Sequence, residues 1–273
     1  MKKVLSLILA AMLMFTLAAC GTNTDENADY SQSVEGASVV AEAGSAGEEL
    51  ATGDDFFANA EFTPVDSMAK ALMEVEAGTA DIAIVDYVTS IGSIGEGTDF
   101  ADLAVVEGKD FSPEEYGIAF RKGSDLTNAV NEAIAELAAD GTMDAIGKNY
   151  KLDALVIKDG KANETEITEG DLAYVKEKGV LNIGITLFAP MNYYDDANKL
   201  VGFETEFAEA VCAKLGVEAN FIEINWDAKE IELNSKNIDC IWNGMTITEE
   251  RLENMSISVP YMQNKQVMVS KVK

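Results

Sequence analysis

Short apolar strands alternate with amphipathic helices along most of this chain, and no other feature restricts its possible folds as strongly. The alternation begins with a strand at 38–43 and ends with a strand at 266–270. Buried strands separated by helices are typical of α/β domains, whose helices cover the faces of a sheet. About 240 residues of this pattern are enough for two lobes. The sequence therefore predicts a two-lobed α/β fold.

The periodicity also places the individual elements. It predicts further strands at 82–85, 116–120, 181–184, 217–222 and 238–242, and helices from Glu48 onward and at 65–77, 125–137, 143–150, 172–178, 203–215 and 229–233. Thr248 is a candidate N-cap for a short helix that reaches Arg251. Residues 158–169 (KDGKANETEITE) are polar and lack periodicity, so they are the best linker in the chain.

The first 20 residues indicate secretion. Two lysines precede an apolar run, Val4–Phe15, that is too short to span a membrane and is typical of a signal peptide over 1–19. Leu17-Ala18-Ala19-Cys20 resembles the bacterial lipobox, in which the cysteine is lipidated and begins the mature chain. The alternative is an ordinary signal peptide that happens to precede a cysteine. With a lipid on Cys20, residues 20–35 would form a flexible tether that holds the domain on the outer face of a membrane.

Charge and rare residues exclude several classes of function. The net charge is −28, and removal of the signal, which carries two lysines and no acid, makes it −30. Such a protein repels nucleic acid and anionic lipid surfaces. Cys212 and Cys240 are too few for a disulfide framework, and we expect two buried free thiols, with a single bridge as the alternative. Because the chain has no histidine, we expect no catalytic residue, metal or cofactor.

Several segments resemble the amino-acid-binding proteins of ABC importers, which have the type II periplasmic-binding-protein fold. The segments that carry this resemblance are 200–206 (LVGFETE), 238–251 (IDCIWNGMTITEER), 258–261 (SVPY), 43–48 (AGSAGE), 81–86 (DIAIVD), 116–123 (YGIAFRKG) and the helical stretch 135–150. Each motif is weak alone, but together they cover almost everything from about Gly36 to Lys273 apart from the linker. The resemblance implies a monomeric protein that binds a free amino acid and delivers it to the permease of an importer.

The order of these segments departs from the family. There, the segments that correspond to 200–206 and 238–251 come first, whereas here they come last. The chain therefore resembles a circular permutant, with 158–169 joining the family's C-terminus to its N-terminus; a gene fragment or a fusion of two partial genes is the alternative. We expect each lobe to be continuous, one at 36–116 and the other at 117–273, with a single covalent crossover at 116–123. The end at Lys273 and the start of the folded chain should then lie close together, and the tether should leave from the hinge.

The resemblance and the chemistry of a zwitterion together predict the ligand-binding residues. Arg251 can hold the ligand carboxylate with two donors, unless it pairs on the surface with Glu250 or Glu253. Ser45 and Ala46 open a helix whose free N–H groups attract the same carboxylate. By resemblance, Asp86 binds the ligand ammonium, joined by the Gly244 carbonyl and the Thr246 hydroxyl.

Residues for the ligand side chain follow by alignment with the family. Phe188 and Trp226 should flank this side chain, although aromatic residues at such positions can simply be core. Asn243 suggests a polar contact, and Met245 lies in the same motif. Family members for basic amino acids keep an aspartate where this chain has Ile185, so we expect a neutral, polar ligand. The rival functions are a ligand sensor and an enzyme of the cyclohexadienyl dehydratase kind, which would need an acid–base pair that the sequence does not reveal.

Overall fold

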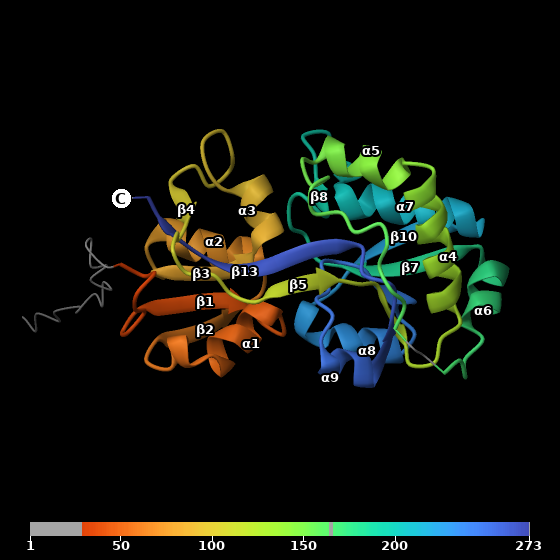
Figure 1. The fold of residues 1–273 in the computed structure, drawn as a ribbon, viewed down its shortest axis with the longest axis horizontal. Helices are drawn as coiled ribbons and strands as arrows, with labels where there is room; N and C mark the ends of the chain where they lie inside the picture. The colour runs from red at the N-terminus through yellow and green to blue at the C-terminus, as the bar shows by residue number, and fades with distance from the viewer. Residues whose placement is uncertain (1–28, 164–165, 273) are drawn as a thin grey trace, which may run out of the picture.

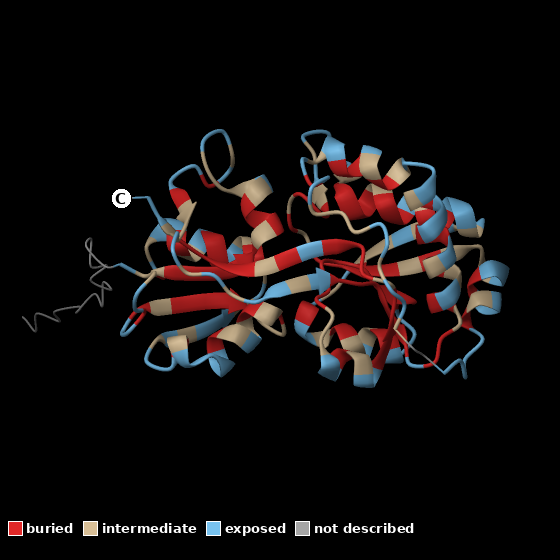
Figure 2. Cartoon of the chain, viewed as in Figure 1, coloured by how far each residue is buried: buried red, intermediate tan, exposed pale blue. Residues whose placement is uncertain are grey.

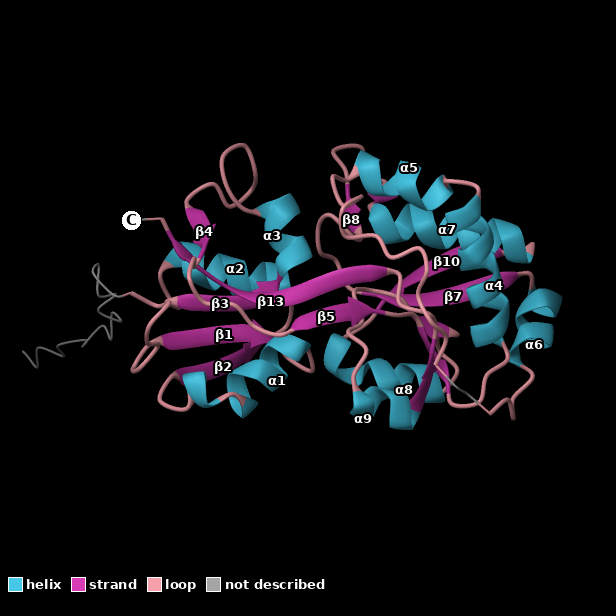
Figure 3. Ribbon diagram, viewed as in Figure 1, coloured by secondary structure: helices cyan, strands magenta, loops and turns pink. Residues whose placement is uncertain are grey.

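The computed structural model describes residues 29–163 and 166–272 and shows two lobes side by side (Figure 1). We call them the Asp86 lobe and the Arg251 lobe, after the residue that each contributes to the cavity between them. Each lobe has a central sheet with helices on both faces (Figure 3). The predicted two-lobed α/β fold is confirmed. The signal peptide at 1–19 and the lipidation site Cys20 lie outside the described residues.

The Asp86 lobe consists of residues 36–116 and the last strand of the chain. Its sheet has the order β2-β1-β3-β13-β4, and β5 pairs with the far half of β13. The strands are β1 (Ser38–Glu42), β2 (Glu61–Val65), β3 (Ile82–Asp86), β4 (Leu103–Val105), β5 (Pro113–Tyr116) and β13 (Met262–Lys271). The helices are α1 (Ala46–Gly53), α2 (Met68–Ala77) and α3 (Tyr87–Ser93), with a 3-10 turn at Asp55–Phe57.

The Arg251 lobe consists of residues 117–261, and its sheet has the order β10-β7-β11-β6-β12. The strands are β6 (Ala119–Arg121), β7 (Val180–Ile185), β10 (Glu218–Glu223), β11 (Cys240–Ile241) and β12 (Met255–Ile257), with a separate hairpin of β8 (Tyr193–Tyr194) and β9 (Leu200–Val201). The helices are α4 (Leu126–Ala139), α5 (Thr142–Asn149), α6 (Asp171–Lys178), α7 (Phe203–Leu215), α8 (Lys229–Asn234) and α9 (Glu249–Asn254), with a 3-10 turn at Trp226–Ala228.

The chain crosses between the lobes twice, which differs from the prediction. It crosses first between β5 and β6 and again where β12 leads into β13. Strand β13 lies between β3 and β4 in the Asp86 lobe, so residues 117–273 do not form one continuous lobe, and the expected single crossover was wrong. The physical reason is the length of β13: its first half pairs with β5 at the crossing, and its buried second half pairs with β3 and β4 of the Asp86 lobe.

The two ends of the described chain lie at the same end of the molecule (Figure 1). Strands β1 and β13 flank β3, with Val39 opposite Ile82 and Val269 opposite Ala83. Two strand spacings put these ends about 10 Å apart. The ends lie far from the crossing strands, however, so the expectation that the tether leaves from the hinge was wrong. The tether is also shorter than expected, because Val34 is buried in the core of the Asp86 lobe and Tyr30 packs against it.

The predicted strand at 116–120 is divided in the structure. Strand β5 ends at Tyr116 in one sheet and β6 begins at Ala119 in the other, because this segment is the first crossing between lobes. The helix that Thr248 was expected to cap is present, and the Thr248 hydroxyl accepts a hydrogen bond from the Arg251 backbone N–H at 3.2 Å.

Burial is highest along the sheets and where α7 packs on the Arg251 sheet (Figure 2). A cluster of aromatic rings occupies the latter position: Phe203, Phe207, Trp242 and Tyr261 have centroids 5.3–6.5 Å apart. Cys212 and Cys240 are buried and free, as expected.

A buried charge network holds α6 to the Arg251 sheet. The Arg121 guanidinium is 3.0 Å from Asp171 and 3.7 Å from Asp239, and it also donates to the carbonyls of Leu233 and Ile238. Asp171 follows directly after the 158–169 segment, so this network anchors the chain where that segment ends.

Replacement Arg121→Ala should lower the free energy of unfolding by about 3 kcal/mol or more, because it leaves Asp171 buried without its cation, whereas Asp239 keeps its ion pair with Lys178. Urea unfolding followed by circular dichroism measures the loss, with Lys176→Ala on the exposed face of α6 as the control. A loss below about 1 kcal/mol would show that the network contributes no more than a surface ion pair.

Candidate functional site

A small cavity lies between the two lobes, and nine of the ten residues predicted to bind ligand line it. These nine are Ser45, Ala46, Asp86, Phe188, Trp226, Asn243, Gly244, Thr246 and Arg251, and Glu42 and Met68 complete the lining. Only about 10 Å³ of free space remains between them, about the room that one water molecule needs. A ligand as large as an amino acid therefore requires the lobes to separate for it to enter.

Arg251 reaches across the cavity from α9 to the Asp86 lobe. Its Nη2 is 2.8 Å from the Glu49 carboxylate, and its Nη1 donates to the Thr246 carbonyl at 2.8 Å. The guanidinium is buried, whereas half of the Glu49 side chain is exposed to solvent. Within the described part of the chain this cation pairs with Glu49 and not with Glu250 or Glu253. One carboxylate is therefore already bound at the place where we expect the carboxylate of a ligand.

A second contact between the lobes is made by Lys229. Its ammonium donates to the carbonyl of Gly44 at 2.8 Å and lies 5.0 Å from the centre of the Trp226 ring. Burial, together with the nearby charge of Arg251, lowers the pKa of Lys229 to about 8. Gly44 has φ +71°, and a Cβ there would lie 2.9 Å from the Cα of Asp227. Glycine is needed at this position because the two lobes approach so closely.

Asp86 ends strand β3 in a buried environment that is rich in carboxylates. It accepts hydrogen bonds from the side-chain amides of Asn264 and Gln266, both on β13. The same two amides donate to Glu114, which also accepts from the Thr246 hydroxyl at 3.2 Å. Burial and the neighbouring Glu114 raise the pKa of Asp86 to about 7. A ligand ammonium beside Asp86 would supply the positive charge that this carboxyl group lacks.

Helix α1 begins at Ala46 and points its N-terminus at the cavity. The Ser45 hydroxyl accepts from Glu48 N at 3.2 Å, and the Glu48 carboxylate accepts from Gly44 N at 2.6 Å. The helix is therefore capped by its own residues, and Ala46 also lines the cavity. The expected cap is present and the segment lines the cavity, whereas its binding of a ligand carboxylate stays a prediction.

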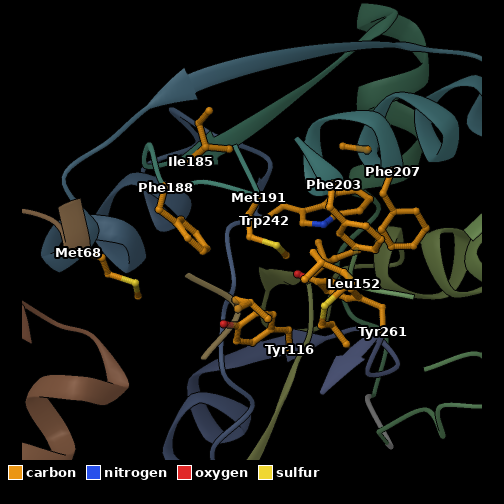
Figure 4. Close-up of a cluster of buried hydrophobic side chains, with 14 of the residues drawn as sticks. Met68, Tyr116, Leu152, Ile185, Phe188, Met191, Phe203, Phe207, Trp242 and Tyr261 are labelled. Carbon is orange, nitrogen blue, oxygen red and sulfur yellow. The ribbon is translucent and has the colours of Figure 1, made fainter. Parts of the chain in front are cut away.

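Three of the predicted residues, Phe188, Trp226 and Asn243, lie on the part of the cavity wall that the Arg251 lobe contributes. Phe188 and Trp226 line the cavity, and Figure 4 shows Phe188 between Met68 of the Asp86 lobe and the aromatic rings of the Arg251 lobe. Asn243 also lines it, but its amide already bonds Thr186 and Asn192 within its own lobe.

Met245 is the one predicted residue that the structure does not bring to the cavity. Its side chain is fully buried in a separate apolar cluster with Ala119 and Ile257, and its carbonyl accepts from Gly117 N at 3.0 Å. Thr246 forms a β-bridge with Tyr116 and faces the cavity, and the side chain of Met245 before it points to the core.

Sequence reasoning missed Glu42 and Met68 on the cavity wall, and Glu49 and Glu114 beside it. Glu42 could have been found, because it ends an apolar strand just as Asp86 does. The other three carry no such signal, since their positions depend on how the lobes close. The acidic pair that the sequence did not reveal is present, because the parallel strands β1 and β3 end side by side and bring Glu42 near Asp86.

Comparison with known proteins finds a family to which part of this chain is similar. Residues 181–273 match the bacterial extracellular solute-binding proteins, family 3. The chain is 38% identical over 109 residues to the L-cystine-binding protein TcyJ of Escherichia coli, a match that covers 40% of this chain and 41% of that protein. It is 36% identical over 106 residues to the L-cystine-binding protein TcyA of Bacillus subtilis, covering 38% and 39%.

The chain spans about two-fifths of the length of the curated relatives that it matches. Among solved structures, an arginine-bound domain 1 of TmArgBP is 30% identical with a TM-score of 0.33, and the match covers 37% of this chain and 84% of that one. Across the part of the chain that the structure describes, no helix is both long and apolar enough to span a membrane.

Three buried carboxyl groups should make the protein less stable as the pH rises from 5.5 to 7. The pKa of Glu42 is raised to about 8, and the pKa values of Asp86 and Glu204 are raised to about 7, mainly because these groups are buried. The unfolded chain has already released these protons above about pH 5, so unfolding releases protons and the folded state loses stability with increasing pH. The opposite contribution of Lys229 begins only near its pKa of about 8.

Urea unfolding at half-unit pH steps measures this slope, which should be about 1.4 kcal/mol per pH unit for each group that stays protonated in the folded protein and about 4 kcal/mol per pH unit for all three. Glu42→Gln should flatten it, and Glu76→Gln on the exposed face of α2 should not. A stability that rises over this window would contradict the assignment of raised pKa values.

Proposed function

We propose that this protein binds a free amino acid between its two lobes and delivers it to an ABC importer. One observation carries the proposal: Arg251 of one lobe and Asp86 of the other face the same closed cavity. A zwitterion needs a cation for its carboxylate and an anion for its ammonium. Because the two groups lie on different lobes, the ligand would contact both and favour the closed state.

The proposal includes the remaining site residues in the roles that the family resemblance implies. The N–H groups at Ser45 and Ala46 would support the ligand carboxylate, and the Gly244 carbonyl and Thr246 hydroxyl would support the ammonium. Phe188 and Trp226 would flank the side chain. We propose no catalytic role, since the named relatives are binding proteins. Incubation with a bound amino acid, followed by mass spectrometry, should therefore return it unchanged.

We also propose that the chain is a circular permutant and is held on the membrane by a lipid on Cys20. Two observations support the permutation: the family match lies at 181–273, after the segments that would follow it in the family, and the ends of β1 and β13 lie about 10 Å apart. Mass spectrometry of the protein from membranes, with and without Cys20→Ser, tests the lipid directly.

Isothermal titration against the twenty amino acids is the primary test of binding. One or a few should bind, and Arg251→Ala should weaken that binding by about thirtyfold or more, because a buried charge pair with the ligand is lost. Lys176→Ala, which removes a distant surface charge, should leave it unchanged. A folded protein that binds none of the twenty would exclude the free-amino-acid assignment.

Glu49 should compete with the ligand for Arg251. Replacement Glu49→Gln should strengthen amino-acid binding by about two- to fivefold, because a partly exposed ion pair of modest strength no longer has to be displaced. Glu250→Gln, a neighbour of Arg251 that makes no such pair among the described residues, is the matched control. Weaker binding after Glu49→Gln would show instead that the Glu49 pair persists in the complex.

A further inference from the structure

Glu42 is a buried carboxyl group that the proposed binding of a zwitterion leaves unused. It ends strand β1 with 3% of its surface exposed and lines the cavity between the lobes. Strand β1 pairs in parallel with β3, so Glu42 lies beside Asp86, on the side that faces Lys229 and Trp226. Its position is therefore next to the expected side-chain pocket.

Among the described residues, the Oε1 atom of Glu42 is buried without a hydrogen-bond partner. Glu204 also has one oxygen without a partner, Oε2, but its Oε1 accepts from Tyr261 and the Gly244 N–H, and Asp86 accepts from Asn264 and Gln266. Among the described residues, Glu42 differs from both in that no donor reaches its carboxyl group. Buried polar atoms in folded proteins are nearly always paired. The missing donor of Glu42 points to a partner that comes from outside the chain.

The charges around the cavity indicate which partner this is. Arg251 would be matched by the ligand carboxylate and Asp86 by the ligand ammonium, which leaves Glu42 without an ion-pair partner. The charge of Lys229 acts on Glu42 and lowers its pKa, but the Lys229 ammonium donates its hydrogen bonds to the carbonyls of Gly44 and Trp226. The cavity that Glu42 lines is also lined by Phe188, Trp226 and Met68. These side chains can hold an apolar stem, and an aromatic face also attracts a cation.

We propose that Glu42 makes the site selective for amino acids whose side chain carries a positive charge at the end of an apolar stem. This inference rests on the proposed amino-acid function and replaces the neutral ligand expected from the sequence. That expectation relied on Ile185 and Asn243. Ile185 lies in the core of the Arg251 lobe, and the Asn243 amide is occupied within its own lobe. The carboxylate comes instead from the opposite lobe.

Binding of such a side chain is coupled to a proton. Burial, with the neighbouring Asp86, raises the pKa of Glu42 to about 8, so the free protein holds a proton there at pH 7. The charged groups that act on Glu42 are Asp86 and Lys229. Glu114 lies near Asp86, and Arg251 lies near Lys229. A cationic side chain adds a positive charge to this set and lowers the pKa of Glu42, so binding releases a proton.

The test compares charged amino acids with neutral ones of the same shape. Isothermal titration at pH 7 uses arginine against citrulline and lysine against norleucine, after bound ligand has been removed by unfolding and refolding. One or both cationic amino acids should bind at least about tenfold more tightly than their neutral partners. Glu42→Gln should abolish that preference by weakening the cationic ligand, and Glu76→Gln should preserve it.

Proton release provides a second readout, which a purely structural role of Glu42 would not change. Titrations in buffers of different ionisation enthalpy should show that arginine or lysine releases more protons than its neutral partner, because Asp86 responds to the ammonium of either ligand, and Glu42→Gln should remove that difference. Equal binding within both pairs, or tightest binding of a neutral amino acid, would overturn the role of Glu42 but keep the proposed function. Absence of any amino-acid binding by the folded protein would overturn both.

Discussion

Strand β13 is the element on which the arrangement of this molecule depends. It leaves the Arg251 lobe after β12, pairs with β5 at the crossing, and continues between β3 and β4 in the Asp86 lobe. Each of its residues from Met262 to Lys271 pairs with one of these three strands, and Val269 pairs with two of them. Its crossing end also carries Asn264 and Gln266, whose amides bind Asp86 and Glu114. The hinge and the cavity are therefore connected by the same strand.

The cavity concentrates carboxyl groups that are costly to bury. Glu42, Asp86 and Glu204 all have raised pKa values because burial disfavours their charged forms. The cations near these carboxyl groups are Arg251 and Lys229, and Arg251 also forms an ion pair with Glu49 of the other lobe. Such an excess of unpaired acid lowers stability, and it is typical of a site that receives a positively charged group. The binding of a cation and the stability of the closed form are thus coupled.

Local structure could be predicted well from this sequence. Helices α7 and α6 and strands β1, β3 and β7 lie within a few residues of their expected positions, because each has a clear apolar period and a clear end signal. Most of the cavity residues were also predicted, since they lie in motifs next to glycine or at strand ends. Met245 was misplaced because a motif identifies neighbours in sequence, whereas the backbone conformation decides which side chains of the motif point to the core.

The sequence by itself determined the α/β class, the two lobes and the chemical types at the cavity: one arginine, one aspartate and a capped helix. Tertiary structure alone decided which sheet contains β13, how many times the chain crosses between the lobes, and which acidic side chains lie close together at the cavity. Periodicity reports whether a strand is buried but not which sheet buries it. Likewise, the contact of Glu49 with Arg251 joins residues about 200 positions apart. Such contacts depend on lobe closure, which no local pattern in the chain encodes.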